Sequence, residues 1–310
     1  MISDLFSVTV LIGILASGIR LATPYLYASI GETFGQRSGV LNLGVEGQML
    51  LGAFAAFYIT LTTGSLWLGV LAAMIVGALM GLAMAYVTVN LQAQQGISGI
   101  GFYLFGLGMS DLLFQKMLGT VETVKGFPKI YIPWLSDIPG IGEILFSQNL
   151  LVYGAYLLVP IAWFVLNKTT LGLKIRSVGE NPDAADSLGV SVAQVRYFTI
   201  ILGGTLSGIA GASLSIALLN VFQQNMTSGL GFIAVALVYF GAWRPIGVLG
   251  GALLFSMINS LQLWIQVLGI NIKSEFAVMM PYVLTILVLV ATVSRVRAPA
   301  ALTKPFEREN

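Results

Sequence analysis

Long apolar stretches dominate this sequence and restrict what it can fold into. Nine of them are close to the length of a membrane-crossing helix, at residues 5–28, 40–61, 66–89, 97–115, 149–166, 197–219, 229–243, 246–268 and 276–294. A helix needs about 20 predominantly apolar residues to cross the hydrocarbon core of a bilayer. Only helices and closed barrels satisfy every backbone N–H and C=O group there. The sequence therefore predicts an all-α, polytopic membrane helix bundle of about nine transmembrane helices.

The composition excludes several other classes of protein. Charged residues make up 9% of the chain and hydrophobic residues 57%, whereas a soluble domain has about 25% charged residues. A net charge of +2 gives no reason to expect a nucleic-acid partner. The chain contains no Cys and no His, so disulfides, thiol chemistry and His-based metal sites are excluded, and we expect no metal or other cofactor. The first residues lack the positive region of a secretory signal, so we expect the first stretch to remain as a helix.

One of the nine stretches is too short to cross as a regular helix. Residues 229–243 number only 15, and Gly229, Gly231 and Gly241 lie among them. Such a segment must be tilted, broken or re-entrant, because 15 helical residues do not span the hydrocarbon core. Broken helices are tolerated where their freed backbone groups are buried in protein or face a wet cavity.

The distribution of Lys and Arg predicts the orientation of the helices. With a cytoplasmic C-terminus, the inner side holds ten basic residues: Arg37, Lys168, Lys174, Arg176, Arg196, Arg244, Arg295, Arg297, Lys304 and Arg308. The outer side holds four: Lys116, Lys125, Lys129 and Lys273. This asymmetry follows the positive-inside rule. It makes 116–148 an external loop, with Tyr131 and Trp134 as interfacial anchors, and 167–196 an internal loop, and residues 1–310 are expected to form one transmembrane domain.

Small residues recur every four positions in two of the stretches. One series is Ala73, Gly77, Gly81 and Ala85, and the other is Gly203, Ser207, Gly211 and Ser215. This spacing places each series on one helix face and allows two backbones to approach closely. We expect these faces to be helix contacts.

Polar residues interrupt the apolar stretch at 40–61. Asn42, Glu46 and Gln48 lie within it, and a carboxylate in the centre of a membrane span costs roughly 2.5–3.5 kcal/mol on insertion scales. Asn42 and Glu46 are four residues apart and would share one helix face. Two hypotheses remain open: that this face lines a substrate path, or that Glu46 hydrogen-bonds the backbone of a broken helix or pairs with a buried Arg.

A second polar series lies on the stretch at 246–268. Asn259, Gln262 and Gln266 follow the i, i+3, i+7 spacing of one helix face. Amide groups both donate and accept hydrogen bonds, which would suit hydroxyl groups or a nucleobase. Hydrogen bonding between helices explains the series equally well.

The internal loop contains the start of a short helix. Asn181 and Pro182 fit the N-cap and first helical position, Asp183 adds negative charge to the first turn, and Gly189 can end the helix. A helix over about 182–188 is too short to be stable alone in water, so it must dock against its own bundle or against a partner.

At these segments the chain resembles the permease subunits of ABC importers, in the branch that transports simple sugars and nucleosides. The similar segments are GETFGQRSGVLNLGVEGQMLLGAF (31–54), TTLGLKIRSVGENPDAADSLGV (169–190), YFGAWRPIGVLGGALLF (239–255) and RAPAALTKPFERE (297–309). The segment around Glu46 and the C-terminal segment are closer to the nucleoside permeases than to the ribose type.

The resemblance implies a transport subunit, not an enzyme, that sits in a bacterial cytoplasmic membrane. Its expected partners are ABC ATPase subunits, a second and homologous permease subunit in a heterodimer, and an external substrate-binding protein or lipoprotein. The chain has no G-x-x-x-x-G-K-[ST] phosphate loop of its own. The expected ATPase-coupling residues are Gly179, Glu180, Asn181, Pro182, Asp183, Ala184, Ala185, Asp186, Ser187, Leu188 and Gly189.

The expected substrate is a nucleoside, with simple sugars as the alternative. A secondary transporter is a further alternative, but Glu46 and Asp111 alone give little support for a coupling-ion site. An intramembrane enzyme would need His, Cys or paired acids within one span, and the sequence offers none of these.

Overall fold

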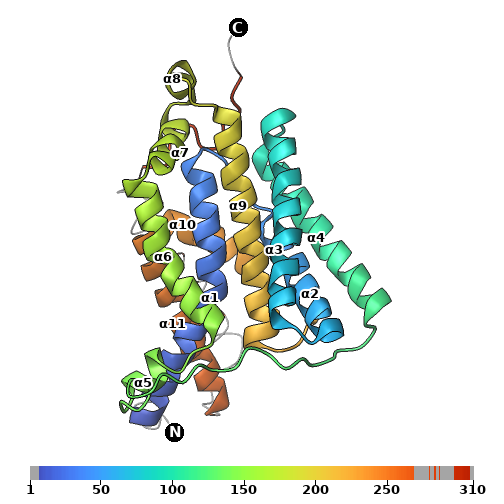
Figure 1. Ribbon diagram of the computed structural model, residues 1–310, viewed down its shortest axis with the longest axis vertical. Coiled ribbons are helices and arrows are strands. Elements are labelled where there is room, and N and C mark those ends of the chain that lie inside the picture. Colours follow the sequence, from blue (N-terminus) through green and yellow to red (C-terminus); the bar gives the residue numbers. More distant parts are fainter. Residues whose placement is uncertain (1–6, 269–278, 280–282, 284–285, 287–296, 308–310) are drawn as a thin grey trace.

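The computed structural model describes residues 7–268, 279, 283, 286 and 297–307. Its helices are arranged as an elongated bundle (Figure 1). They are α1 (Val8–Arg37), α2 (Val45–Thr63), α3 (Leu66–Ala85), α4 (Gln95–Met117), α5 (Ile141–Leu145), α6 (Leu150–Lys168), α7 (Thr170–Glu180), α8 (Pro182–Ser187), α9 (Val192–Ser213), α10 (Leu230–Phe240) and α11 (Pro245–Val267). Two short π-helical segments, η2 (Tyr86–Asn90) and η3 (Leu214–Leu218), extend α3 and α9.

Side-chain caps explain where many of these helices begin. An N-cap side chain accepts a hydrogen bond from an otherwise unpaired backbone N–H of the first turn. This arrangement occurs at Ser7, Ser65, Asn149, Thr169, Asn181 and Ser191. The predicted start of a short helix at Asn181 and Pro182 is therefore confirmed, and Gly189 follows that helix with a φ of +82°.

Helix α9 lies at the centre of the bundle and packs against α1, α2 and α3 (Figure 1). Its close approach to α3 depends on glycine. A Cβ atom added at Gly77 would lie 2.2 Å from the carbonyl oxygen of Gly204, and one added at Gly208 would lie 2.1 Å from the carbonyl oxygen of Ala73. The small-residue face predicted on α3 is thus a helix contact, as expected.

The predicted face of α9 packs against other helices than α3. A Cβ atom at Gly211 would lie 2.0 Å from the carbonyl oxygen of Met49 on α2, whereas Gly203 lies against Gly31 on α1. The neighbouring pair Gly204 and Gly208, which the four-residue series does not include, meets α3. Because α9 is surrounded, two of its faces need small residues.

Seven helices of the described chain are long and apolar enough to cross a membrane, which is fewer than the nine predicted. They correspond to the first six predicted stretches and to 246–268. The seventh stretch, 229–243, contains α10, an apolar helix of only 11 residues. The ninth, 276–294, lies outside the described residues except for Met279, Val283 and Ile286. The polytopic all-α architecture is confirmed, and the stretch at 229–243 is not a full-length helix.

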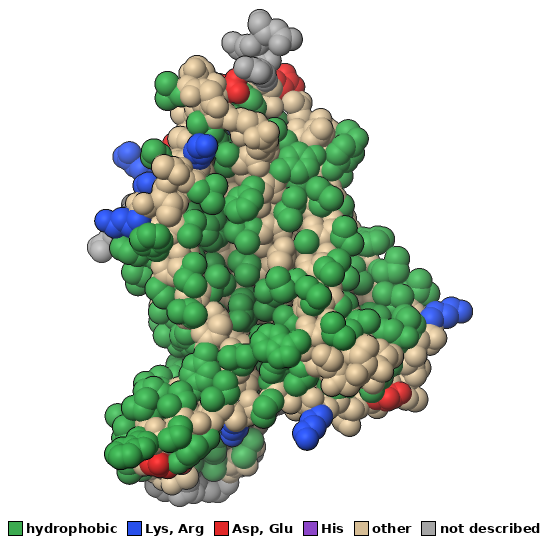
Figure 2. Space-filling view, viewed as in Figure 1, with side chains coloured by type: hydrophobic (Ala, Val, Ile, Leu, Met, Phe, Trp, Pro, Cys, Tyr) green, Lys and Arg blue, Asp and Glu red, His purple; other side chains and the backbone are tan. Residues whose placement is uncertain are grey.

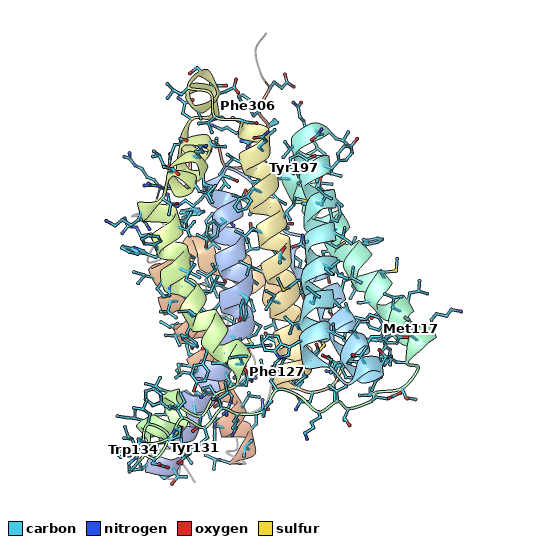
Figure 3. All side chains as sticks on the ribbon, in the orientation of Figure 1. Met117, Phe127, Tyr131, Trp134, Tyr197 and Phe306 are labelled. Carbon is cyan, nitrogen blue, oxygen red and sulfur yellow. The ribbon has the colours of Figure 1, made fainter. Side chains whose placement is uncertain are left out.

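The two ends of the bundle differ in what they present. One end carries α7, α8 and the C-terminal segment, and the other carries α5, the start of α1 and the loop after α4 (Figure 1). Hydrophobic side chains cover the middle of the face in Figure 2, and charged side chains gather toward its ends. Tyr197 and Phe306 mark the first end in Figure 3, whereas Tyr131 and Trp134 mark the second. The loops predicted as internal and external therefore lie at opposite ends. We call these the α8 end and the α5 end.

Candidate functional site

The chain turns back between α1 and α2 through a buried polar connection, residues 38–44. Glu32, near the end of α1, is buried and accepts hydrogen bonds from the backbone N–H of Asn42 (3.0 Å) and from Nε2 of Gln36 (3.0 Å). The Gln36 amide oxygen in turn accepts a bond from the indole N–H of Trp243 (2.7 Å). This network joins the end of α1, the connection and the segment after α10.

Asn42 closes the connection onto α2. Its Nδ2 donates to Oε1 of Gln48 (3.2 Å), and its Oδ1 accepts from the backbone N–H of Gly44 (2.9 Å). Asn42, Glu46 and Gln48 are all buried inside the subunit. The structure therefore joins Asn42 directly to Gln48, whereas the Glu46 side chain binds other groups. Gln48 Nε2 is a buried donor without a hydrogen-bond partner among the described residues.

Glu46 caps the short helix α10. Its Oε1 accepts hydrogen bonds from the Thr227 hydroxyl (2.6 Å) and the Gly229 backbone N–H (2.7 Å), and its Oε2 accepts one from the Gly231 backbone N–H (2.6 Å). Gly229, at the N-cap, has a φ of +90°. A carboxylate is favoured at this place because the N-terminal end of a helix carries partial positive charge.

This arrangement explains how a broken span is tolerated. The chain after η3 runs without regular helix from Leu219 to Gly229 and then forms α10. Each unpaired backbone N–H within hydrocarbon costs several kcal/mol, and Glu46 satisfies two of them. Of the two hypotheses for Glu46, the backbone-binding arrangement is the one present in the structure. A role of Glu46 toward substrate stays a prediction.

Close packing adds to the contact between α2 and α10. A Cβ atom at Gly231 would lie 2.6 Å from both N and Cα of Glu46. Only glycine permits α10 to approach the first turn of α2 at this distance. The Gly-x-Gly pattern at 229–231 was visible in the sequence. Its pairing with Glu46 was not, because Glu46 lies 183 residues from Gly229.

The second predicted polar series lies apart from this cluster, on α11. Gln262 is buried, Asn259 is partly exposed and Gln266 is exposed. The adjacent face of α11 binds the first half of α1: the Ser260 hydroxyl donates to the Ile14 carbonyl (2.8 Å), and the Trp264 indole N–H donates to the Ser17 hydroxyl (3.2 Å). The series therefore follows one edge of the α1–α11 pair toward the α5 end.

The predicted coupling residues lie together at the α8 end, from the end of α7 through α8 (Figure 1). Asn181 caps α8 by accepting from the Ala184 backbone N–H (3.1 Å). Ala185 is buried against the subunit's own core, whereas Ala184 is exposed and the Leu188 side chain is 85% exposed. The short helix thus docks on its own bundle through the side that carries Ala185, and Ala184 and Leu188 face outward.

Arg196 is a functional candidate that the sequence analysis did not single out. It is buried on α9, where its Nε donates to the Ser38 carbonyl (3.3 Å) and its guanidinium NH1 donates to the Lys304 carbonyl (3.1 Å). It therefore ties the α1–α2 connection to the C-terminal segment. A lone Arg near the end of an apolar stretch gave no hint of this, because such residues are common at the inner ends of spans.

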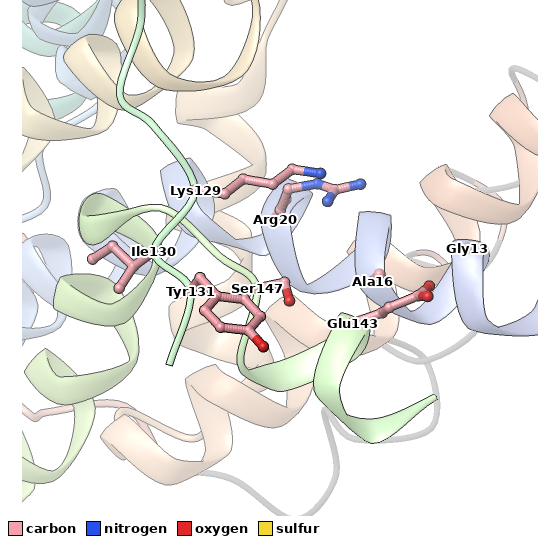
Figure 4. Close-up of a pocket in the computed structure, with 8 residues that line it drawn as sticks. All are labelled: Gly13, Ala16, Arg20, Lys129, Ile130, Tyr131, Glu143 and Ser147. Atoms are coloured by element: carbon pink, nitrogen blue, oxygen red, sulfur yellow. The ribbon is translucent and has the colours of Figure 1, made fainter. Parts of the chain in front are cut away.

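A pocket of about 440 Å³ opens at the α5 end (Figure 4). Arg20 of α1 and Lys129 of the loop after α4 point to the same part of it, and Glu143 of α5 lies apart from them (Figure 4). Nearby, Tyr131 donates a hydrogen bond to Asp137, which raises the pKa of the tyrosine hydroxyl. Arg20, which lies within the predicted stretch 5–28, thus lies beside the loop that was predicted to be external.

Comparison with known proteins identifies the family. The family described as "Branched-chain amino acid transport system / permease component" matches residues 14–289. The chain belongs to this family. No solved structure matches the chain.

Three relatives align over nearly their whole length. The guanosine ABC transporter permease protein NupQ of Bacillus subtilis is 38% identical over 92% of this chain and 93% of its own. The nucleoside ABC transporter permease protein NupC of Lactococcus lactis is 38% identical over 93% of this chain and 94% of its own. TsgC13 of Haloferax volcanii, named as a candidate glucose ABC transporter permease, is 37% identical over 96% and 98%.

These relatives and the apolar helices show a multi-pass membrane permease subunit of an ABC transporter. Such a subunit works with ATP-hydrolysing subunits and a substrate-binding protein. Bacillus subtilis also has a second guanosine permease relative, NupP, which is 27% identical over 76% of this chain.

Proposed function

We propose that this subunit forms part of the path of an ATP-driven nucleoside importer. The observation that supports this most directly is 38% identity over nine-tenths of the chain to two permeases named for guanosine and for nucleosides. The glucose name of TsgC13 keeps simple sugars as the second candidate. The whole chain, 1–310, acts in this proposal as one permease domain in the cytoplasmic membrane, with the α8 end and the C-terminus in the cytoplasm.

The partner subunits follow from the same relatives. NupP and NupQ are two different guanosine permeases of one organism, which supports a heterodimer of this chain with a homologous second permease. ATPase subunits would dock on residues 179–189, and an external binding protein would deliver substrate at the α5 end.

The polar residues divide into two proposed roles. Asn42 is already hydrogen-bonded to Gly44 and Gln48, so it holds the α1–α2 connection against α2. Glu46 already accepts from the backbone N–H groups of Gly229 and Gly231, so it holds the start of α10 in place. Gln48 keeps an unpaired donor inside the subunit and can meet substrate only when the surrounding helices separate. Asn259, Gln262 and Gln266 lie along an edge that is open in part, so they contact substrate in a path between two permease subunits.

Amide side chains suit this task because each offers both donors and acceptors. The ribose hydroxyls and base edges of a nucleoside present both as well. A row of similar, weak binding sites along the path also allows the nucleoside to be released, whereas a single tight site would retain it.

The substrate is tested with the cognate substrate-binding protein of this permease. Thermal unfolding of that purified protein is measured with guanosine, adenosine, cytidine, ribose and glucose, followed by competition of the same compounds in an uptake assay that requires this permease. We expect nucleosides to raise the melting temperature and to compete for uptake. Stabilisation by glucose or ribose, with no effect of any nucleoside, would overturn the nucleoside assignment in favour of sugars.

A further inference from the structure

The C-terminal segment 297–307 is bound to several separate parts of the α8 end. The backbone N–H of Ala301 donates to the Gly179 carbonyl (2.9 Å), and that of Thr303 donates to the Gly39 carbonyl (3.1 Å). The carbonyls of Lys304 and Phe306 accept from Arg196 (3.1 Å) and Gln92 (3.3 Å).

These four contacts reach four different elements. Gly179 lies on α7, two residues before the N-cap of α8, and Gly39 lies in the α1–α2 connection. Arg196 belongs to α9, and Gln92 to the connection between η2 and α4. The segment has no regular helix, but hydrogen bonds from its backbone fix it to four elements, and Ala301 is only 4% exposed. It is therefore an integral part of the fold.

A groove of about 380 Å³ runs between this segment and the start of α8. One wall is formed by Glu180, Asn181, Pro182 and Asp183, and the other by Ala300, Ala301, Lys304, Pro305, Phe306 and Glu307. Asn181 and Pro182 are also the N-cap and first residue of α8. Any protein that covers the first turn of α8 therefore also covers the C-terminal wall.

The surface around the groove has the composition of a contact site. Leu188, at the end of α8, exposes 85% of its side chain outside the membrane-crossing helices, and Phe306 is partly buried in the groove wall. Apolar anchors surrounded by polar residues are typical of protein interfaces. Three of the four charged groove residues are acidic: Glu180, Asp183 and Glu307.

We propose that the C-terminal segment and α8 form one docking surface for the ATPase subunit, which enters the groove with a basic segment. This rests on the proposed function, which places the ATPase at α8, and extends it to the groove residues of the C-terminal segment: Ala300, Ala301, Lys304, Pro305, Phe306 and Glu307. The ATPase would then directly contact the C-terminal segment, which is hydrogen-bonded to Gly39. Gly39 belongs to the α1–α2 connection, which continues to Asn42 and then to Glu46 at the start of α2.

Single cysteines test the surface, because the chain has none of its own. Leu188→Cys, Lys304→Cys and, as the control at the α5 end, Trp134→Cys are introduced into the complete transporter and treated with a short cysteine-to-amine crosslinker. We expect adducts with the ATPase from positions 188 and 304 and none from 134. An adduct from 188 without one from 304 overturns this proposal but leaves the proposed function standing. If neither position 188 nor position 304 gives an adduct, the proposed docking of the ATPase at the α8 end is overturned, and this proposal with it.

A second pair of variants tests whether the segment takes part in coupling. Thr303 has a φ of +65° and donates its N–H to Gly39. Thr303→Pro cannot adopt this φ and has no N–H to donate. Thr303→Gly can adopt this φ and keeps the N–H. With equal amounts of folded permease, we expect Thr303→Pro to lower the substrate taken up per ATP hydrolysed several-fold and Thr303→Gly to leave it unchanged. An unchanged ratio in Thr303→Pro would overturn the coupling role.

Discussion

Replacement of Glu46 tests the central contact of the structure. In Glu46→Leu, the backbone N–H groups of Gly229 and Gly231 lose their acceptor, whereas the Thr227 hydroxyl can turn elsewhere. A buried donor left unsatisfied costs about 1–3 kcal/mol. The two together cost about 2–6 kcal/mol, a large part of the roughly 5–15 kcal/mol that holds a typical protein folded. We expect little folded protein.

Glu46→Gln gives a graded version of the same change. Its amide oxygen can still accept from Gly229 and Thr227, but its NH₂ group would face the Gly231 N–H. One unsatisfied donor costs about 1–3 kcal/mol, which corresponds to a decrease in melting temperature of roughly 2–12 °C by the scaling of domains of 150–250 residues. Thermal unfolding of the purified permease in detergent measures this decrease. Thr227→Val is the matched control, since it removes one donor and leaves no N–H unpaired.

Two results would refute the capping argument. One is a wild-type melting temperature in Glu46→Leu. The other is a wild-type melting temperature in Glu46→Gln together with reduced uptake, which would instead show that the carboxylate meets the substrate. Uptake that falls in proportion to the loss of folded protein is the result that the structure predicts.

Three further predictions concern packing, coupling and orientation. Gly77→Leu should prevent α3 from packing on α9, because a Cβ atom there already meets the Gly204 carbonyl at 2.2 Å, whereas Gly101→Leu should be tolerated because nothing lies within 4 Å; the yield of monodisperse protein separates the two. Leu188→Arg should preserve folding but reduce uptake driven by ATP, whereas Ala185→Arg should reduce the folded protein, because only Leu188 is exposed; equal loss of folded protein in both would contradict this. A cysteine placed at Asp186 should react with a membrane-impermeant reagent only from the cytoplasm and one at Lys125 only from outside, and labelling of both from one side would show that the two ends are misassigned.

The sequence alone was sufficient for the local features of this protein. Hydropathy placed the long helices, because burial in lipid needs about 20 apolar residues whatever the tertiary structure. The 15-residue stretch with Gly229 and Gly231 was predicted as irregular, and the cap formed by Asn181 and Pro182 was predicted as a helix start. Both depend on residues close together in the chain.

Only the tertiary structure decided what the polar residues do. Glu46 lies 181 to 185 residues from the groups that it binds, and no local pattern relates such positions. The same holds for Ala301 with Gly179 and for Arg196 with Lys304. Which side of α8 faces outward was also open, because Ala184 and Ala185 are chemically identical and differ only in which one meets the core. Helix formation is governed by neighbouring residues, whereas hydrogen bonds between distant segments exist only once the helices have packed.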